Sequence, residues 1–225
     1  MRAGAIGTPL LFQSVFSLQS AAGNQRLKAT AWGGPLQDVG VYCINAVRHI
    51  FAEEPVDAMA IAHCPTSDPR FGEIDATIAA TLRFPSGGIA QFFASFGAAA
   101  ADNYRVVGTL GDMEVDPGFR FETVTLLRLR RNGTTVETVF RQIDHFGAQV
   151  AYFSECIKAG MPPEADGEEG LADMRVLHTN ERAAETGFPQ AIVSPARARR
   201  PVPEMVLLVP KMVLLVPIIG RRLIL

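Results

Sequence analysis

Two neighbouring segments with a strict two-residue alternation constrain this fold more than any other feature of the sequence. In IDATIAATLRF (74–84) and IAQFFASFGA (89–98) every second residue is apolar, and the short segment PSGG lies between them. Successive side chains of a strand point to opposite faces of its sheet, so this pattern indicates two strands that are each buried on one face. A sheet with one covered face and one open face is therefore expected.

The rest of the chain supplies further strands and then helices. Strands are expected at 5–19, 55–64, 103–109 and 111–116, and on both sides of Asn132-Gly133, a dipeptide suited to a tight hairpin turn. One helix is expected from Pro35 to about Glu54 and another ends at Gly187. Between them a third helix carries an apolar stripe, namely Phe146, Val150, Phe153 and Ile157. This order predicts the α+β class, with a largely antiparallel open sheet and helices on one face.

Composition separates the end of the chain from its body. The 225 residues carry a net charge of −2, which gives no indication of nucleic-acid binding. From Ala191 to Leu225, however, six basic residues stand against one acidic residue, and the segment MVLLVP occurs twice. We expect residues 1–190 to form one domain and 191–225 to be an Arg-rich linker and apolar tail, with everything from about Ala196 outside the fold.

The remaining bulk features favour a cytoplasmic protein that does not span a membrane. The tail is interrupted by prolines and a lysine, and it falls short of the roughly 20 apolar residues that a membrane helix needs. No secretory signal is evident at the N-terminus. Cys43, Cys64 and Cys156 are too scattered for a disulfide framework or a zinc site, so all three are expected to be core thiols.

One predicted helix carries two residues that could take part in proton transfer. In GGPLQDVGVYCINAVRHIF (33–51), Asp38 and Tyr42 lie four residues apart and so share a helix face, which Asn45 extends. A tyrosine near a cation can exchange a proton with a substrate hydroxyl, and a carboxylate can orient it. Alternatively, Asp38 is a first-turn acid favoured by the helix dipole and Tyr42 is a packing residue. Spacing alone favours the second interpretation.

A family resemblance changes that balance. The segment GGPLQDVGVYCINAVRHIFAEEP resembles the G-G-x-L-x-D-x-G-x-Y segment of the Gfo/Idh/MocA family, in the branch that includes glucose–fructose oxidoreductase and dihydrodiol dehydrogenase. Later segments are similar to successive parts of the family's C-terminal domain, among them YRVVGTLGDMEVDP, DHFGAQVAYFSECIKAG and PPEADGEEGLADMRVLHTNERAAETG. The resemblance covers about residues 4–190.

The resemblance implies a site and a reaction. Members of the family are NAD(P)-dependent oxidoreductases that act mainly on sugars, polyols and related alcohols. By position, Tyr42 matches the residue that exchanges the proton, and Asp38 matches the family's helix acid. Arg26 matches an arginine near the substrate, and Asn45 is a further candidate for substrate binding. The family's C-terminal domain usually also makes the oligomer contact, so a homo-oligomer through the sheet face is expected.

Other parts of the family pattern have no counterpart in these 225 residues. No G-x-G-x-x-G follows a strand and opens a helix, and the lysine of the family's E-K-P motif is absent. We therefore expect a truncated chain that binds no cofactor alone and is inactive alone. Two alternatives stay open: a non-catalytic partner that dimerises through its sheet, and one chain of a split enzyme completed by a separate Rossmann subunit.

Overall fold

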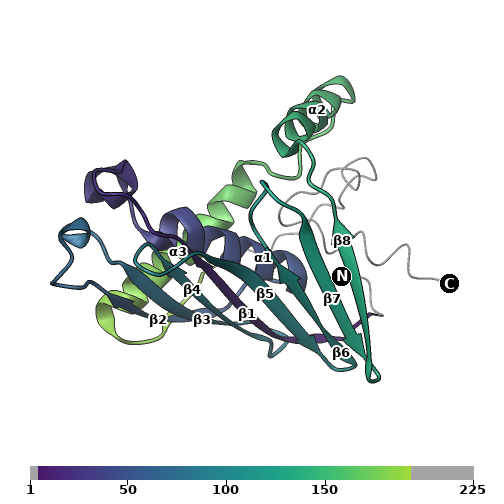
Figure 1. Cartoon of the computed structure of the whole chain (residues 1–225), viewed down its shortest axis with the longest axis horizontal. Helices are drawn as coiled ribbons and strands as arrows, with labels where there is room; N and C mark the ends of the chain where they lie inside the picture. Colours follow the sequence, from purple (N-terminus) through teal and green to yellow (C-terminus); the bar gives the residue numbers. More distant parts are fainter. Residues whose placement is uncertain (1–4, 194–225) are drawn as a thin grey trace.

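The computed structural model describes residues 5–193 of the chain, and the predicted tail from Ala196 onward lies outside the described residues (Figure 1). The described part is one nine-stranded sheet with helices packed on one of its faces. Its strands are β1 (Pro9–Ser17), β2 (Asp57–His63), β3 (Thr77–Arg83), β4 (Ile89–Ser95), β5 (Ala101–Gly108), β6 (Gly111–Asp116), β7 (Thr125–Arg131), β8 (Thr134–Phe140) and β9 (Gln190–Ala191). Its helices are α1 (Val41–Phe51), α2 (His145–Lys158) and α3 (Gly167–Thr186).

The strand order is β8-β7-β6-β5-β1-β4-β3-β2-β9. Every neighbouring pair is antiparallel except β1 and β4, which run parallel. The first strand is thus inserted between β4 and β5, and Phe12 faces Ala90 on one side and Val106 on the other. The predicted α+β class with a largely antiparallel open sheet is confirmed.

The alternation in β3 and β4 divides the sheet into a covered and an open face. The side chains predicted to point inward are buried, including Ile78, Leu82 and Phe92. Helices α1 and α3 cover this face, and α1 contributes Ile44 and Val47 to the same continuous core. On the opposite face large apolar side chains remain exposed: Leu11, Met59, Ile61, Ile89 and Phe93.

Local backbone geometry explains where several elements end. Asn132 and Gly133 both adopt positive φ angles, 51° and 76°, as a two-residue hairpin turn requires, and Gly187 ends α3 at φ 70°. The first predicted helix stops at Phe51, where Ala52 adopts φ 55°, three residues before the predicted end. The sheet also continues past residue 190, because Ala191 belongs to β9 and Ile192 is buried.

Two predictions about side chains are wrong or incomplete. Cys43 and Cys156 are buried thiols as expected, but Cys64 is exposed because it lies just beyond the end of β2. Helix α2 forms as predicted, yet its apolar stripe does not face the core. Figure 1 shows α2 standing clear of the layer that α1 and α3 form over the sheet. No helix among residues 5–193 is long and apolar enough to cross a membrane.

Candidate functional site

Three of the four residues predicted to form a site lie close to one another at the start of α1. A loop brings Arg26 beside the first helical turn, where its Nε lies 3.2 Å from Oδ1 of Asp38. Asn24 begins the short 3-10 helix Gln25–Leu27 because its side chain accepts a hydrogen bond from the Arg26 backbone N–H. Later in the same loop, the Gly33 backbone N–H donates a hydrogen bond to the Lys28 carbonyl.

Asp38 and Tyr42 are joined by an unusual helical segment. Residues Leu36–Gly40 form a π-helical turn that leads directly into α1. Such turns are uncommon and occur frequently at functional sites. Burial raises the pKa of Asp38, and the neighbouring Arg26 guanidinium opposes that rise. Burial and the Asp38 charge also raise the pKa of Tyr42, against the effect of Arg26. Burial and the Asp38 charge thus both favour the neutral phenol over the phenolate.

An aromatic group holds the Tyr42 ring. Phe16 of β1 meets it edge-on with the ring centroids 5.5 Å apart, and Phe119 lies 6.1 Å away. Phe119 in turn stacks on Phe16 at 5.3 Å and contacts Tyr104 at 5.6 Å. Aromatic rings in contact at these distances restrict one another's orientation. The hydroxyl of Tyr42 is thus carried on a ring that has little freedom to move.

A buried carboxylate fixes the loop that supplies Phe119. The two oxygens of Asp102 accept hydrogen bonds from the backbone N–H groups of Gly118, Phe119 and Arg120, at 3.1, 2.7 and 2.9 Å. Burial nevertheless raises the pKa of Asp102, against the effect of these donors. Asp102 was not predicted as a functional residue. In the sequence it is an isolated acid beside strand 103–109, and only the fold brings residues 118–120 to it.

The fourth predicted residue, Asn45, points elsewhere. Its side-chain amide donates to Asp173 of α3 at 2.9 Å, so it does not join Arg26, Asp38 and Tyr42. The same carboxylate binds Arg48, a fully buried arginine that also forms a two-bond pair with Glu54 (2.6 and 2.8 Å). Asn45 therefore belongs to a polar cluster between α1 and α3. Its predicted contact with a substrate stays a prediction.

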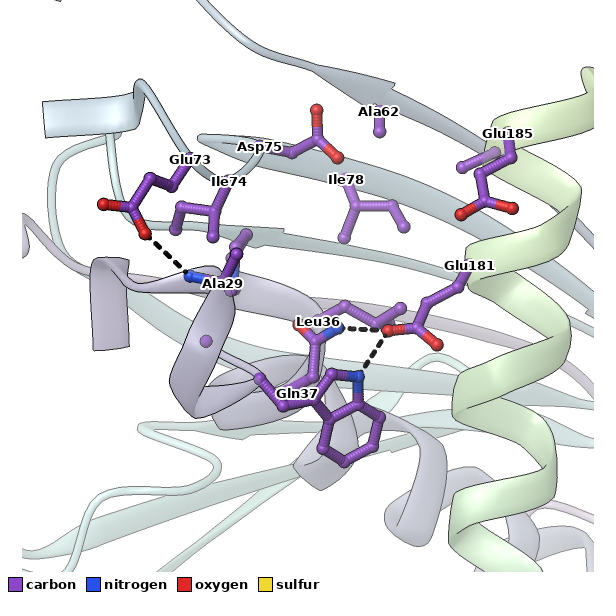
Figure 2. A pocket seen from close by; sticks show the side chains of 15 residues that line it. Ala29, Leu36, Gln37, Ala62, Glu73, Ile74, Asp75, Ile78, Glu181 and Glu185 are labelled. Carbon is purple, nitrogen blue, oxygen red and sulfur yellow. Dashed lines mark hydrogen bonds between the residues drawn. The ribbon is translucent and has the colours of Figure 1, made fainter. Parts of the chain in front are cut away.

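A polar cavity of about 540 Å³ lies beside this segment, between the 29–37 loop, the start of β3 and the end of α3. Figure 2 shows Glu181 directed from α3 toward Gln37. Its carboxylate accepts hydrogen bonds from the side chains of Gln37 and Trp32, at 2.6 and 2.8 Å. The charged side chains that line the cavity are all carboxylates: Glu73, Asp75, Glu181 and Glu185. A cavity lined this way repels phosphate groups, so it does not fit the pyrophosphate of a dinucleotide.

The described residues contain neither a cluster of metal ligands nor the glycine-rich turn that binds a dinucleotide. No group of three or more His, Cys, Asp or Glu side chains is placed to hold a metal ion within residues 5–193. Helix α1 follows a π-helical turn and a loop, whereas a dinucleotide site needs a glycine-rich turn between a strand and a helix.

Comparison with known proteins decides the family. The model of the GFO/IDH/MocA C-terminal domain matches residues 1–114. The chain is also 31% identical over 190 residues to a D-xylose 1-dehydrogenase [NADP(+)] from Haloarcula marismortui, a match that covers 81% of this chain and 52% of that protein. The chain belongs to the Gfo/Idh/MocA family. The family resemblance drawn from the sequence is confirmed.

Other members of the family are similar over the same region. A 1,5-anhydro-D-fructose reductase from Ensifer adhaerens is 25% identical, over 82% of this chain and 56% of that protein. The crystal structure of aldose–aldose oxidoreductase from Caulobacter crescentus with glycerol superposes with a TM-score of 0.79 at 33% identity, over 84% of this chain and 57% of that one. This Gfo/Idh/MocA chain thus spans about half the length of the curated relatives it matches.

Gly33 allows two parts of the loop that carries Arg26 to approach each other closely. A Cβ placed on Gly33 would lie 2.3 Å from the Arg26 carbonyl oxygen, closer than real contacts allow. We expect Gly33→Ala to lower the free energy of unfolding by about 1–3 kcal/mol, as overpacking generally does. It should also move Arg26 away from Asp38. Urea denaturation and absorbance titration of the tyrosines would measure both effects.

The matched control for that substitution is Gly72→Ala. Gly72 also lies in a loop, but its φ is −68° and an added Cβ would meet nothing closer than 3.8 Å. It should therefore be nearly neutral. Equal stability of the two variants would contradict the role assigned to Gly33.

Proposed function

We propose that this chain is the substrate-binding and oligomerisation domain of an NAD(P)-dependent oxidoreductase that acts on a sugar, polyol or related alcohol. The observation that carries the proposal is the Arg26–Asp38–Tyr42 cluster, set on aromatic rings in a chain of this family. The similarity to a D-xylose dehydrogenase and an aldose–aldose oxidoreductase supports a sugar as the substrate class.

The three residues divide the work in the proposed site. Tyr42 exchanges a proton with the substrate oxygen, although burial and the Asp38 charge raise its pKa and so oppose formation of the phenolate. Asp38 accepts hydrogen bonds from substrate hydroxyls, while Arg26 balances its charge and holds it in place. Phe16 and Phe119 fix the direction of the phenol. The nicotinamide cofactor is assigned to a separate nucleotide-binding unit, so the chain is expected to be inactive alone.

Ligand binding by the purified chain tests this division. Saturation-transfer NMR should show contact with D-xylose or glycerol, and the signal should weaken in Asp38→Asn and Arg26→Gln. Tryptophan and NADPH fluorescence should show no association of NADPH with the chain alone. Micromolar affinity for NADPH would overturn the assignment, and unchanged sugar contacts in both variants would remove Asp38 and Arg26 from the site.

The oligomer contact is proposed to use the open face of the sheet. Five large apolar side chains are exposed there, and no helix covers that face among residues 5–193 (Figure 1). Exposed apolar surface of this extent marks interaction sites. The same face would serve the second candidate function, that of a non-catalytic dimerisation partner. Sugar contact with the purified chain distinguishes the two, because a pure dimerisation partner has no need of a sugar site.

Phe93→Lys is expected to disrupt this contact. Phe93 lies on β4 near the middle of the open face, and a charge there would have to be buried between two copies of the sheet. Light scattering should give a dimer for the unaltered chain and a monomer for the variant. Gln91→Lys, on the same strand but already polar, should weaken the dimer much less. A clean monomer of the unaltered chain would contradict the proposal.

A further inference from the structure

The Glu181 carboxylate joins the end of α3 to the loop of the candidate site. Its Oε1 accepts hydrogen bonds from the indole N–H of Trp32 at 2.8 Å and from the side-chain amide of Gln37 at 2.6 Å. Its Oε2 lies 2.8 Å from Nδ1 of His178, about one turn earlier on the same helix. Figure 2 shows the carboxylate reaching from α3 to Gln37. Hydrogen bonds to a charged acceptor are stronger than neutral ones, so this contact holds the loop firmly on the helix.

Each of the two loop donors lies next to one partner of the Arg26–Asp38 ion pair. Gln37 directly precedes Asp38 in the chain. Trp32 directly precedes Gly33, which packs so closely on the Arg26 backbone that an added Cβ would lie 2.3 Å from the carbonyl oxygen. One carboxylate on α3 therefore holds both sides of the pair. Both sides must keep their places for Nε of Arg26 to stay 3.2 Å from Oδ1 of Asp38.

Trp32 is held in a backbone conformation that a tryptophan rarely adopts. Its φ of 48° and ψ of 42° lie in the left-handed region. Such strain persists only where the surrounding contacts over-determine it. Those contacts are the hydrogen bond to Glu181 and the ring of His178, whose centroid lies 5.2 Å from that of the Trp32 ring. The side chain is still 38% exposed, so these contacts with α3, more than burial, keep Trp32 in place.

We propose that Glu181 is a positioning residue of the sugar site, and that it acts by holding the Arg26–Asp38 pair together. This inference rests on the proposed function, in which Asp38 binds sugar hydroxyls. Among residues 5–193, neither Asp38 nor Tyr42 lines the cavity that Glu181 borders, so Glu181 acts through the loop and not by touching the reacting groups. Helix α3 is a firm support for this contact, because the buried Arg48 of α1 binds two of its carboxylates.

Two alanine variants of α3 test the proposal in the full chain. Glu181→Ala removes the acceptor. Glu185→Ala is the matched control, because Glu185 lies one turn further along the same helix and lines the same cavity. Titration with D-xylose, followed by saturation-transfer NMR, should show affinity about tenfold weaker in Glu181→Ala, a typical effect between coupled residues, and unchanged affinity in Glu185→Ala.

A conservative variant keeps the test decisive if Glu181→Ala fails to fold. Glu181→Gln has the same shape and retains one oxygen that can accept from Trp32 and Gln37, but it loses the charge. Its affinity for D-xylose should therefore lie between that of Glu181→Ala and that of the unaltered chain. Circular dichroism would establish the folding of each variant. An affinity of Glu181→Gln equal to that of the unaltered chain is expected only if the charge is dispensable, and would contradict a charge-assisted contact.

The pKa of Asp38 gives a readout that needs no sugar and that a general loss of stability would not move. The Arg26 guanidinium lowers the pKa of Asp38, against the effect of burial. Release of Arg26 in Glu181→Ala should therefore raise that pKa, as measured by carbon-13 NMR titration of the carboxyl group. In an Arg26→Gln background Glu181→Ala should change neither this pKa nor the affinity for D-xylose, because no pair remains to be held.

The other outcomes decide against the proposal or against the proposed function. Equal affinities of Glu181→Ala and Glu185→Ala, or an Asp38 pKa that does not change, would overturn the positioning role. Effects of Glu181→Ala that persist undiminished in the Arg26→Gln background would do the same, since they would show that Glu181 acts by another route. If the unaltered chain bound no D-xylose, the proposed function would fail, and the Asp38 titration would still decide whether Glu181 holds the pair.

Discussion

Replacing Arg48 with methionine is expected to lower the free energy of unfolding by about 3–5 kcal/mol, because breaking a buried ion pair leaves uncompensated charge. Arg48 is 0% exposed and binds Glu54, Asp173 and Glu169, the last with Nη1 3.0 Å from Oε1. Burial alone would lower the pKa of Arg48, but these carboxylates raise it, so the guanidinium stays charged. Without it, three carboxylates would face one another between α1 and α3. Guanidinium chloride denaturation would measure the loss.

The loss should depend on pH in a defined direction. Burial raises the pKa of Asp173, and Arg48 is the chief opposing influence, so the variant should raise that pKa further. A carboxyl group whose folded pKa lies above its unfolded value stabilises the fold at low pH and loses that contribution as pH rises through the folded pKa. The difference between Arg48→Met and the unaltered chain should therefore shrink as the pH is lowered from 7 toward 5.

Arg83→Met is the control for Arg48→Met. Arg83 also binds a carboxylate, Asp57, but its side chain is 64% exposed. Surface ion pairs contribute about 0–1 kcal/mol, so this variant should change stability little. If the two arginine substitutions had equal effects, or if the loss at Arg48 did not vary with pH, the buried cluster would not be what joins α1 to α3.

Tyr42→Phe is expected to lower the rate of sugar turnover by about 10²–10⁴-fold in the enzyme assembled with a nucleotide-binding unit, the usual contribution of a general acid or base. The substitution removes only the hydroxyl and leaves the contacts of the ring with Phe16 and Phe119 in place. Stability and sugar affinity should therefore change little. Steady-state kinetics should show the loss in kcat rather than in KM.

Tyr104→Phe is the matched control for Tyr42→Phe. Tyr104 contacts the same Phe119 ring but is fully buried, so its hydroxyl is not accessible to a substrate, and burial raises its pKa. Loss of its hydroxyl should leave turnover unchanged. If the two variants were equally active, Tyr42 would not exchange the proton.

The sequence predicted the sheet and one covered face because those features depend on local periodicity. The alternation of apolar side chains in 74–84 and 89–98 indicates burial directly, since each strand has one solvent-exposed face and one buried face. The position of β1 between β4 and β5 carries no such signal, because a parallel neighbour leaves the pattern of a single strand unchanged. The exposed stripe of α2 was likewise hidden, since periodicity shows that a helix face is apolar but not what covers it.

The candidate site was predicted in part for a similar reason. Asp38 and Tyr42 lie within the segment that carries the family pattern, Arg26 lies shortly before it, and the fold brings the three together. Asn45 follows at helical spacing, but the π-helical turn before α1 and the carboxylate of Asp173 place it in a different cluster. Asp102 binds the backbone of residues 118–120, and Arg48 binds carboxylates of α3. These partners lie far away in the sequence, so no local sequence pattern predicts either role.

Reconstitution tests the central claim most directly, namely that this chain carries the sugar-binding half of a nicotinamide-dependent oxidoreductase. The full chain and a purified dinucleotide-binding unit would be assayed separately and mixed, with an aldose and NADP, by the absorbance of NADPH. The account predicts aldose-dependent NADPH formation only in the mixture, and its loss with Tyr42→Phe. Turnover by the chain alone, or an associated mixture that binds both ligands and remains inactive, would contradict it.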